Sequence, residues 1–568
     1  MDEIDILHFN DVYHTSDVEL VPRFASTLSK PNHVLDGFTP ARHQLRVFSG
    51  DAFSPSLEAS VLHGGHMIDL LNALNIDVAC YGNHDFDFGE ARLSHLSRQT
   101  NFPWTLANAV RKHCVGDQRR YLAQAQKFVT REVAGYRLGF FGLAGTDWPS
   151  NCQHLPDCEI HDPASDGRRL AAHLRNSERC DFVIAVTHMR LAEDLKLSQA
   201  TLSGDGKIDL ILGGHDHYVL RRTHTDTNFD PSIIQPGVHD IAGPATQFNG
   251  FAHIIKSGTD WRGLSIVRLR VERLSDGSAS ISDMNLKQIV DLTKMPKYHQ
   301  IPPCPKALAA IAKSLESIDK LVQQPLVYAD ISLEGRSTLI RSQESNLGNM
   351  VADAVRAFYN SDIALVNSGG IRCDRVIERS KDVPLCIRDI LDISPFDNAM
   401  VVKRVSGSTI ALSLENSVSD AHTDGRFMQV SGLSISVNWH HEEGDRILSI
   451  FHHPRQNPAP YPLQHDRMYT VAMTNFIAAG FDGYSCFEST ETMIDVEGAM
   501  TDTNLLLEVF GGAFTSRDRV DGELNDNTTA GLMRARKEIV IAYNESDGLP
   551  VIRPRLEGRI KVISGVNL

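Results

Sequence analysis

Gly82-Asn83-His84-Asp85 and Gly213-Gly214-His215-Asp216-His217 are the two stretches that decide the fold of this 568-residue chain. Each follows a short apolar run, Val78–Tyr81 in the first case and Asp209–Leu212 in the second, with the length and composition of a buried β-strand. Glycine beside polar residues is common in turns, so either stretch alone is typical of a loop. The second stretch is more informative, because two imidazoles at i and i+2 in an extended chain point to one side.

Three further strand-like runs end in the same kinds of residue. In an open α/β sheet, ligands bind in the crevice outside the carboxyl ends of the strands, so polar residues placed there converge on one location. The five elements together therefore indicate a single site rather than five independent turns. They are Asn10-Asp11-Val12-Tyr13, Ser49-Gly50-Asp51, Gly82-Asn83-His84-Asp85, Thr187-His188 and Gly213-Gly214-His215-Asp216-His217.

The pattern of apolar segments divides the chain into two blocks. In residues 1–300, strand-like runs alternate with helical patterns, which predicts a layered α/β domain with largely parallel strands. The strands expected there are Ile4–Phe9, Leu45–Ser49, Val78–Tyr81, Leu138–Leu143, Phe182–Thr187 and Asp209–Leu212, and the helices are Met67–Leu74 and Leu170–Leu174.

A linker helix is expected between the blocks, over residues 301–324, after three prolines in Ile301–Pro305. The alternative is that this helix simply opens the second domain, residues 325–568. The apolar stripe of the helix is Leu308, Ile311, Leu315, Ile318 and Val322. The second domain is expected to hold strands at Ile363–Val366, Met400–Val405 and Thr470–Met473, a helix at Asn346–Tyr359 and a polar surface insertion at Ser516–Gly548.

Composition is that of a globular protein, with 42% hydrophobic and 22% charged residues. The net charge of −15 does not favour binding to a nucleic-acid polymer or to anionic lipid. No apolar run approaches the ~18 residues of a membrane span. The N-terminus lacks a basic n-region and an apolar h-region, and the nine cysteines follow no disulfide spacing. We therefore expect a cytoplasmic monomer or homodimer, with a secreted or periplasmic location as the alternative if a leader has been removed.

The motif Gly-Asn-His-Asp-Phe-Asp at 82–87, together with Gly-Gly-His-Asp-His at 213–217, resembles the calcineurin-like metallophosphoesterases and, within them, the 5′-nucleotidases. Asn-Ser-Gly-Gly-Ile-Arg at 367–372 and Pro-Phe at 395–396 resemble the C-terminal domain of the same family. The resemblance extends over nearly the whole chain. It implies a four-layer α/β/β/α metallophosphoesterase domain at 1–300, a linker helix at 301–324 and a second, α+β substrate-binding domain at 325–568.

The resemblance also implies two divalent metal ions bridged by Asp51. One ion would bind Asp11, Asp51 and His217, and the other would bind Asp51, Asn83, His188 and His215. Carboxylate, amide and imidazole ligands without thiolate suit Zn, Mn, Co or Fe. Two such ions ~3.5–4 Å apart can clamp an in-line displacement at phosphorus. His84, oriented by Asp87, would face the phosphoryl group and the leaving oxygen.

The first motif departs from the Asp-x-His of the family, because Asp11 is followed by Tyr13 and then His14. Residues two apart in an extended chain share a face, so Asp11 and Tyr13 are expected to point together while His14 points away. Water or the Tyr13 phenol would then complete the first metal site. We expect this site to bind its ion more weakly than the second site does.

In the second block, the resemblance implies a nucleotide-binding site. Two aromatic rings would sandwich the base, an asparagine would hydrogen-bond it, a glycine would let it approach, and two arginines would face the phosphate. Without the resemblance, the same residues are typical of loops with solvated arginines and partly buried aromatics. The residues are Arg341, Asn367, Gly369, Arg372, Phe396 and Tyr484.

The reaction expected from these features is hydrolysis of nucleoside 5′-monophosphates to nucleoside and phosphate. The same scaffold can accept other leaving groups, so a 2′,3′-cyclic-nucleotide phosphodiesterase or a nucleotide-sugar hydrolase is the alternative. A third hypothesis is a nucleotide-binding protein with weakened catalysis. Tyr13 favours that hypothesis, and the presence of His84 and of the other proposed ligands opposes it.

Overall fold

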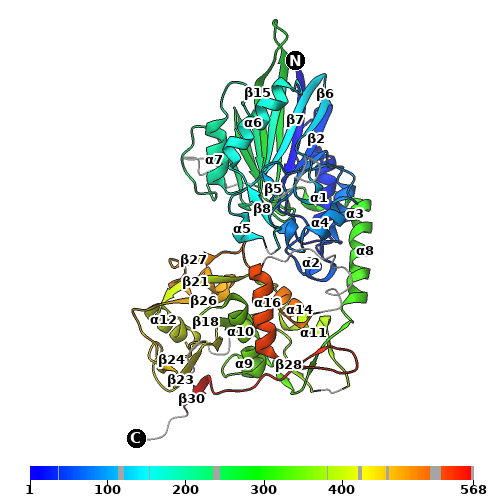
Figure 1. The fold of residues 1–568 in the computed structure, drawn as a ribbon. Helices are drawn as coiled ribbons and strands as arrows, with labels where there is room; N and C mark the ends of the chain where they lie inside the picture. Colours follow the sequence, from blue (N-terminus) through cyan, green and yellow to red (C-terminus); the bar gives the residue numbers. More distant parts are fainter. Residues whose placement is uncertain are drawn as a thin grey trace. The chain divides into compact units, whose positions relative to one another are not determined.

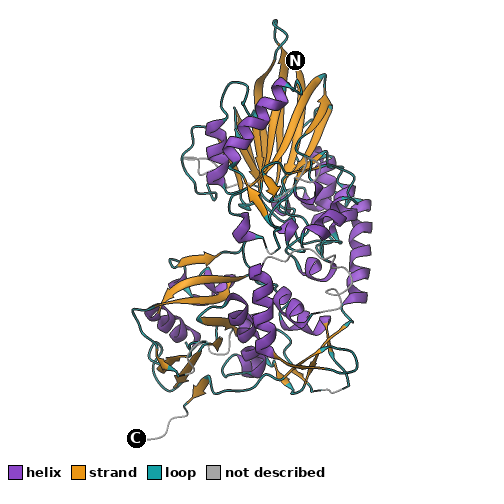
Figure 2. Cartoon of the chain, viewed as in Figure 1, coloured by secondary structure: helices purple, strands orange, loops and turns teal. Residues whose placement is uncertain are grey.

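The computed structural model describes residues 1–35, 37–112, 121–152, 154–233, 244–379, 382–419, 425–455, 459–511 and 526–563. They form two compact units, one spanning Met1–Ile318 and a second that begins at Asp319. Each unit combines helices with β-sheets and has its own hydrophobic core (Figures 1 and 2). The two-domain α/β fold class predicted from the sequence is confirmed.

Two mixed β-sheets form the centre of the first unit. Parallel pairing runs through β1 to β4 in one sheet and through β7, β9, β10 and β13 in the other, with antiparallel strands outside them. The seven-stranded sheet contains, in spatial order, β12 (Ala245–Asn249), β15 (Ala279–Ile289), β14 (Leu264–Arg273), β1 (Asp2–Phe9), β2 (His43–Phe48), β3 (Val78–Cys80) and β4 (Trp104–Thr105). The six-stranded sheet contains β11 (Val219–Arg222), β13 (Ile254–Ser257), β10 (Leu210–Gly213), β9 (Phe182–His188), β7 (Tyr136–Ala144) and β6 (Val129–Val133).

Helices pack against both sheets, which produces the predicted layered arrangement (Figure 2). α6 (Pro163–Asn176) and α7 (Leu191–Ala200) cover the six-stranded sheet through a cluster that includes Leu174 and Leu195. α1 (Leu20–Ser29) and α3 (Met67–Ala73) share an apolar core with the seven-stranded sheet. The shorter elements of this unit are α2 (Leu57–Leu62), α4 (Glu90–Ser97), α5 (Trp148–Asn151), β5 (Ala109–Arg111) and β8 (Cys158–Ile160).

Helix α8 (Pro305–Leu321) lies mostly in the first unit, and the boundary between the two units falls inside it, after Ile318. Proline at its first position is well tolerated, because the first N–H of a helix has no acceptor within the helix. Its buried face consists of small residues and one isoleucine: Ala307, Ala310, Ile311 and Ser314. Leu308 and Leu315, by contrast, are each 37% exposed. The face that packs therefore overlaps the apolar stripe seen in the sequence only in part, through Ile311, and Val322 of the stripe is buried just beyond the helix.

The second unit is an α+β structure made of short strands. Its five-stranded sheet contains β22 (Met428–Ser431), β18 (Ile363–Asn367), β26 (Met468–Thr474), β21 (Met400–Ser406) and β27 (Glu491–Ile494). Two four-stranded sheets contain β25 (Tyr461–Pro462), β24 (Ile447–His452), β23 (Leu433–Val437) and β30 (Ile560–Val562), and β20 (Leu385–Cys386), β16 (Pro325–Ala329), β29 (Pro550–Ile552) and β28 (Val540–Tyr543). β17 (Leu333–Glu334) pairs with β19 (Val376–Ile377). The helices are α9 (Ser337–Ile340), α10 (Asn346–Tyr359), α11 (Ile387–Ile393), α12 (Gly407–Ser417), α13 (Asn475–Ala478), α14 (Asp502–Phe510) and α16 (Asp526–Ile539).

Helix α16 corrects the expectation of a surface insertion at Ser516–Gly548. Residues 516–525 lie outside the described residues, but from Asp526 the chain forms a helix that packs on α10 and α14. Leu532, Ala535 and Ile539 are buried in that contact. The polar residues that suggested an insertion begin the helix, where Asp, Asn and Thr are favoured because they can cap exposed N–H groups.

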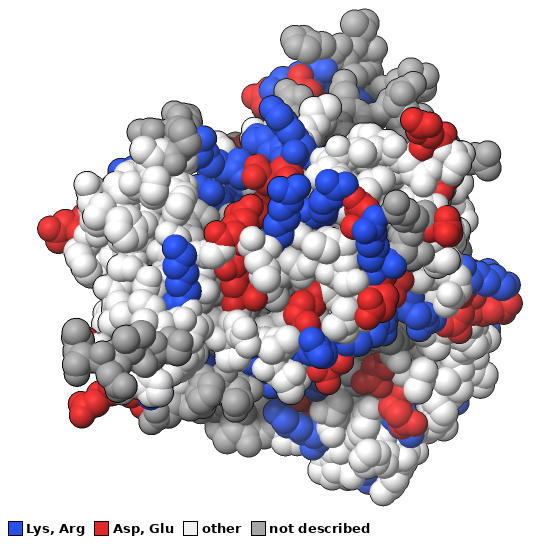
Figure 3. All heavy atoms as spheres, turned by 90° about the horizontal axis from the view of Figure 1, so that it is seen from below, with Lys and Arg blue, Asp and Glu red and all other residues white. Residues whose placement is uncertain are grey.

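Charges on the surface are mixed rather than segregated. Figure 3 shows basic and acidic side chains interleaved on one face of the molecule. Within the second unit, Arg559 pairs with Asp353 and Glu557, and Arg553 pairs with Asp330. Among the helices that the structure describes, none is long and apolar enough to cross a membrane.

A buried lysine ties together the loops that follow β9 and β10. The Nζ atom of Lys256 in β13 donates to the carbonyl oxygens of Met189 and Gly214, at 2.7 and 2.8 Å. The same ammonium group forms ion pairs with the carboxylates of Asp194 and Asp216, at 2.8 and 2.5 Å. Burial opposes the charge, but the two carboxylates raise the pKa of this lysine above its ordinary value. The aspartate in the middle of the Gly-Gly-His-Asp-His stretch therefore anchors its loop.

Replacing Lys256 with methionine should destabilise the protein by about 3–5 kcal/mol, because it leaves two buried carboxylates without their cation. Urea denaturation of the parent and of Lys256→Met measures the difference. Lys313→Met is the matched control, since Lys313 pairs with Asp69 at the exposed surface and its loss should leave the midpoint unchanged. Equal midpoints for Lys256→Met and the parent would contradict the role assigned to Lys256.

Candidate active site

The predicted strand-end residues converge at the carboxyl ends of the two sheets of the first unit. Asp11 follows β1, Asp51 follows β2, and Asn83 follows β3, while His188 ends β9 and His215 follows β10. Because parallel strands share their carboxyl edge, the local sequence places all of these side chains at one edge of each sheet.

The backbone at this edge is strained in the way expected of a functional site. Asp11, Asp51, His215 and His217 adopt left-handed conformations, with φ of 53°, 62°, 79° and 61°. Such conformations cost a non-glycine residue of order 1 kcal/mol or more, and they persist only where the surroundings impose them. The sharp turns after β1, β2 and β10 are therefore held by the rest of the fold.

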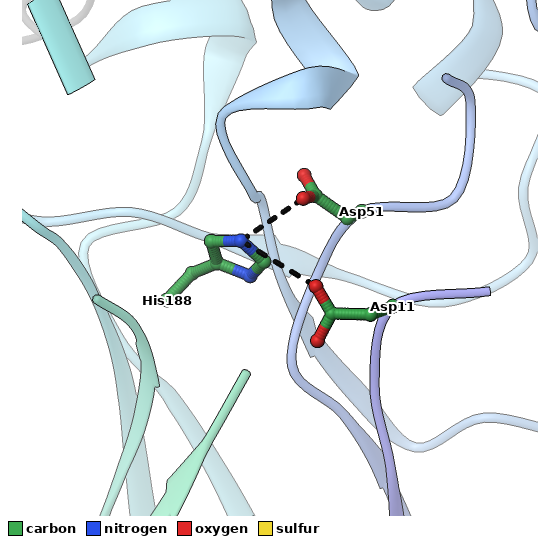
Figure 4. Close-up of side chains that lie close together, drawn as sticks. All are labelled: Asp11, Asp51 and His188. Carbon is green, nitrogen blue, oxygen red and sulfur yellow. Dashed lines mark ion pairs between the residues drawn. The ribbon is translucent and has the colours of Figure 1, made fainter. Parts of the chain in front are cut away.

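At the centre lies a cluster of two carboxylates and one imidazole (Figure 4). Asp11, Asp51 and His188 are fully buried, and His188 Nε2 lies 3.1 Å from Asp51 Oδ2 and 3.8 Å from Asp11 Oδ1. The other ring nitrogen, Nδ1, lies 2.7 Å from the carbonyl oxygen of Ser49, which directs Nε2 toward the carboxylates. Burial lowers the pKa of His188, but the two carboxylates outweigh it and raise that pKa to about 10.

The side chains of this cluster fit a metal centre. Ligand atoms of Asp11, Asp51 and His188 all lie within 4.8 Å of one another. Asn83 Oδ1 is buried without a hydrogen-bond partner in the described residues. An unpaired buried polar atom costs about 1–3 kcal/mol, and a bound cation would satisfy this oxygen and neutralise the carboxylates. The donor set contains no thiolate, which suits Zn, Mn, Co or Fe.

Asp85 holds two of these loops in place, a role that the sequence did not suggest. Its carboxylate accepts backbone N–H groups from Asp51, Ala52, Phe53 and Gly82, at 2.8–3.2 Å. Burial, together with the charge of Asp51, raises the pKa of Asp85 to about 6. A Cβ on Gly82 would lie 2.0 Å from Asp51 Oδ1, so the Gly-Asn-His-Asp stretch begins with the one residue that fits there.

His215 has a different neighbour from the one the sequence predicts. Its Nε2 lies 3.0 Å from Asp147 Oδ2, and the same carboxylate oxygen accepts from Arg190 Nε at 3.0 Å. Burial raises the pKa of Asp147, but the bond to His215 outweighs it and brings the pKa well below its usual range. Nothing in the sequence around Asp147 distinguishes it from a loop aspartate, and its contact with His215 is set by the tertiary fold. The role of His215 as a metal ligand stays a prediction.

Tyr13 and His14 point in the directions expected from their spacing. The Tyr13 hydroxyl lies 3.1 Å from Asp11 Oδ1, whereas His14 is 51% exposed and faces Glu58 and Asp260 at 3.9 and 4.0 Å. His217 Nε2 lies 3.4 Å from Asp11 Oδ1, on the same side as the tyrosine. The structure thus brings the predicted ligands of the first metal together and leaves His14 outside them.

His84 and Asp87 form the predicted pair. His84 Nδ1 lies 2.9 Å from Asp87 Oδ2, and the same oxygen accepts from Ser54 Oγ at 2.8 Å. The backbone N–H of His84 donates to Asp51 Oδ1 at 2.9 Å. The imidazole is therefore oriented through one nitrogen while its backbone is tied to the carboxylate that would bridge the metals.

In the second unit, Asn367 and Gly369 lie at the carboxyl end of β18. Asn367 Oδ1 accepts from the Thr474 hydroxyl at 3.0 Å, which fixes the orientation of the amide. Gly369 donates its N–H to the carbonyl oxygen of Gly425 at 2.8 Å, and a Cβ at position 369 would lie 3.0 Å from Gly425 Cα. The glycine is thus required by a close approach of two backbone segments within this unit.

The two predicted aromatic residues are in different environments. Phe396 is 54% exposed, and the Arg372 guanidinium lies 4.9 Å from the centre of its ring. Tyr484 is fully buried, donates its hydroxyl to the carbonyl oxygen of Arg426 at 2.6 Å, and stacks on Phe487. As placed, the Tyr484 ring offers no face to a ligand, so the predicted sandwich has an exposed ring only at Phe396.

The sequence analysis missed an exposed aromatic pair next to these residues. Phe481 is 59% exposed and stacks on Phe476, with ring centres 4.9 Å apart. In the sequence, Phe476 lies two residues after Thr474, whose hydroxyl donates to Asn367.

Arg341, the other predicted phosphate ligand, directly follows α9. The preceding residue, Ile340, accepts a hydrogen bond from Ser368 Oγ at 2.5 Å through its carbonyl oxygen.

Comparisons with known proteins agree with this architecture. A family model described as the 5′-nucleotidase C-terminal domain matches residues 327–489. The trifunctional nucleotide phosphoesterase protein YfkN of Bacillus subtilis is 24% identical over 519 residues, which is 85% of this chain and 32% of that protein, so the chain spans about a third of that relative. The 5′-nucleotidase of Homo sapiens is 24% identical over 509 residues, covering 85% of this chain and 84% of that protein. The solved NAD nucleotidase of Haemophilus influenzae shares the fold, with a TM-score of 0.65 at 16% identity over 99% of each chain.

A double-sheet α/β unit with carboxylate and imidazole side chains at its strand ends is therefore followed, along the chain, by a domain that matches the 5′-nucleotidase C-terminal model. The chain thus contains a region that matches the 5′-nucleotidase C-terminal domain, and over most of its length it is similar to proteins named 5′-nucleotidase.

Replacing His84 with alanine should lower kcat by ~10²–10³ and leave metal content unchanged, because the imidazole would act on the leaving oxygen and not as a ligand. Metal analysis beside steady-state kinetics measures both quantities. His95→Ala, on the exposed surface of α4, is the control and should change neither. Loss of bound metal from His84→Ala would show that His84 is a ligand.

Proposed function

We propose that this protein is a metal-dependent hydrolase of nucleotide phosphate esters, and that nucleoside 5′-monophosphates are its main substrates. The observation that carries the proposal is the fully buried group of Asp11, Asp51 and His188, with the unpaired amide oxygen of Asn83 beside it. The match of residues 327–489 to the 5′-nucleotidase C-terminal domain and the similarity to proteins named 5′-nucleotidase support the substrate class. We propose residues 1–300 as the catalytic domain, 301–324 as the linker helix and 325–568 as the substrate-binding domain.

The residues proposed to hold two divalent ions are those implied by the sequence. Asp51 would bridge the ions, with Asp11 and His217 on one side and Asn83, His188 and His215 on the other. When bound, the ions would supply Lewis acidity at the phosphoryl group. Asp85 and Ser49 would position Asp51 and His188 through the hydrogen bonds described above.

The remaining work falls to residues of the chain itself. His84, oriented by Asp87, would donate a hydrogen bond or a proton to the leaving ribose oxygen, where negative charge develops. In the second unit, Arg341 and Arg372 would bind phosphate oxygens through their guanidinium groups. Asn367 would hydrogen-bond the base by its amide, which Thr474 already orients.

A cytoplasmic location and a monomeric or homodimeric state also belong to the proposal. The eight cysteines in the described part of the chain form no disulfide, which fits a reducing compartment.

Chelation should abolish phosphate release from nucleoside 5′-monophosphates, and Mn, Co or Zn should restore it, because the bound ions would supply the Lewis acidity that hydrolysis requires. The measurement is phosphate release over a panel that also contains 2′,3′-cyclic nucleotides and a nucleotide sugar. Full turnover after prolonged treatment with excess chelator would overturn the metal assignment. A clear preference for cyclic nucleotides or nucleotide sugars would replace the proposed substrate by one of those two.

Phe396→Ala should weaken nucleotide binding by about 1–3 kcal/mol, the usual contribution of a stacked base. Hydrolysis of a small aryl phosphate, which needs no base site, should change little. Tyr484→Ala should instead destabilise the protein by about 3–5 kcal/mol, because it opens a cavity in the core of the second unit. Phe451→Ala, another partly exposed phenylalanine of that unit, is the control. Equal losses on nucleotide and aryl phosphate for Phe396→Ala would mean that its ring does not contact the base.

A further inference from the structure

A cavity of about 650 Å³ lies within the second unit. Residues of α10, β22, β23 and α16 line it, together with the segment that leads into β30 (Figure 1). In β22 its lining residue is Ser431, which pairs with Ala364 of β18, whereas Asn367, proposed to bind the base, pairs with Met428. Ala364 and Asn367 are ~10 Å apart along an extended strand. The cavity therefore lies toward the amino end of β18 and is separate from the nucleotide site proposed at its carboxyl end.

Cationic side chains predominate around this cavity. Five arginine and lysine side chains line it against three carboxylates, a formal net charge of +2 in a chain whose total is −15. All three carboxylates already pair with arginines: Asp353 and Glu557 with Arg559, at 2.8 Å each, and Glu538 with Arg455 at 3.7 Å. These carboxylates therefore do not neutralise the other cations of the lining.

Three cations of the cavity have no carboxylate partner in the part of the chain that the structure describes. They are Arg356, Arg555 and Lys561. The remaining cation, Arg553, pairs with Asp330. An anion that enters the cavity would therefore meet positive charge that the fold has not neutralised.

Arg356 is held in place by backbone groups rather than by an acid. Its Nε and Nη2 donate to the carbonyl oxygens of Asp362 and His453, at 2.9 and 2.6 Å. The guanidinium also packs against Gly432, where a Cβ would lie 2.7 Å from Arg356 Cζ, so the glycine leaves the room that the guanidinium occupies. Burial, reinforced by the nearby charge of Arg455, lowers the pKa of Arg356 to about 10. A bound anion would stabilise this charged group.

Apolar side chains form another part of the lining. They are Met350 of α10, Leu433 of β23, Ile539 at the end of α16 and Ile541 of β28. The volume of the cavity lies within the ~300–1,000 Å³ typical of small-molecule sites, which combine apolar walls with a few placed polar groups. A free phosphate ion would contact only the cations, whereas an organic phosphate would also bury its carbon skeleton against these residues.

We propose that this cavity binds an organic phosphate monoester at a site separate from the catalytic one. Arg356, Arg555 and Lys561 would hold the phosphate, which carries about −1.5 to −2 charges at pH 7 and so matches the net charge of the lining. Planar guanidinium groups bind phosphate oxygens in pairs, and an ammonium group adds a point charge. The organic group would lie on the apolar residues. This site uses none of the proposed metal ligands, so its occupation is independent of the metal centre.

The test is calorimetric titration of the full chain with naphthylmethylphosphonate, an organic phosphate analogue that resists hydrolysis because carbon replaces the ester oxygen. The quantity measured is the number of phosphonate molecules bound per chain. The double variant Arg555→Gln/Lys561→Gln changes two exposed side chains, and circular dichroism checks that it folds. It should lose one binding event that the parent shows. The same event should persist in Arg372→Gln, which removes a proposed ligand of the substrate phosphate, and in the control Arg404→Gln, whose side chain is 53% exposed on β21.

Orthophosphate and naphthylmethanol separate the two parts of the ligand. Orthophosphate should bind this site about tenfold or more weakly than the phosphonate, because it buries no apolar surface, and the uncharged alcohol should not bind. Equal affinities for orthophosphate and phosphonate would overturn the organic part of the ligand. An unchanged number of bound phosphonate molecules in Arg555→Gln/Lys561→Gln would overturn the site itself, while phosphate release from nucleoside 5′-monophosphates tests the proposed function separately.

Discussion

Two carboxylates with no exposed surface, those of Asp11 and Asp51, lie within 4 Å of a single imidazole nitrogen, and the arrangement of the first unit depends on neutralising them. Burying one unpaired carboxylate costs several kcal/mol, and two carboxylates facing the same centre repel each other. His188 neutralises part of this negative charge, because its raised pKa keeps the imidazole protonated. Bound cations would neutralise the remaining charge, which is why these side chains are better explained as ligands than as structural polar residues.

Holding the carboxylates in this position requires support from residues that do not touch the centre. Asp85 gathers four backbone N–H groups around the turn after β2, and Lys256 ties the loops after β9 and β10 to each other. Both supports are themselves buried charges, so each is satisfied by several partners at once. Left-handed conformations at four of the site residues show that the turns are held against their local preference.

In the second unit, polar groups held by hydrogen bonds lie at the end of β18, whereas the exposed groups are aromatic rings. Asn367 is oriented by Thr474, and Gly369 is fitted against Gly425, so this end of β18 has a fixed backbone and amide. The exposed rings, Phe396 and Phe481, lie in the segments around it. A fixed polar group with exposed aromatic faces nearby suits a flat, polar-edged ligand such as a nucleobase, because stacking tolerates any base while the amide sets its orientation.

Much of the first unit could be predicted from the sequence, because the local sequence is enough to show where each strand of a parallel sheet ends. Short apolar runs located the strands, and the Asp, Asn and His residues after them located the site, since the carboxyl edge collects whatever follows each strand. The directions of Tyr13 and His14 followed in the same way from the two-residue period of extended chain. These are consequences of local geometry, which the sequence carries directly.

Only the tertiary structure decided which groups meet across the chain. The contact between His215 and Asp147 joins residues 68 positions apart, and the sequence around neither residue predicts it. Burial of Tyr484, exposure of Phe481 and the packing of α16 likewise depend on which surfaces other segments cover. For α8, a sequence stripe of large apolar residues indicated one face, yet Leu308 and Leu315 of that stripe are partly exposed, and the buried face consists of Ile311 with alanine and serine. The spacing of apolar residues shows which face of a helix could be buried, and the segments that pack on the helix determine which face is buried.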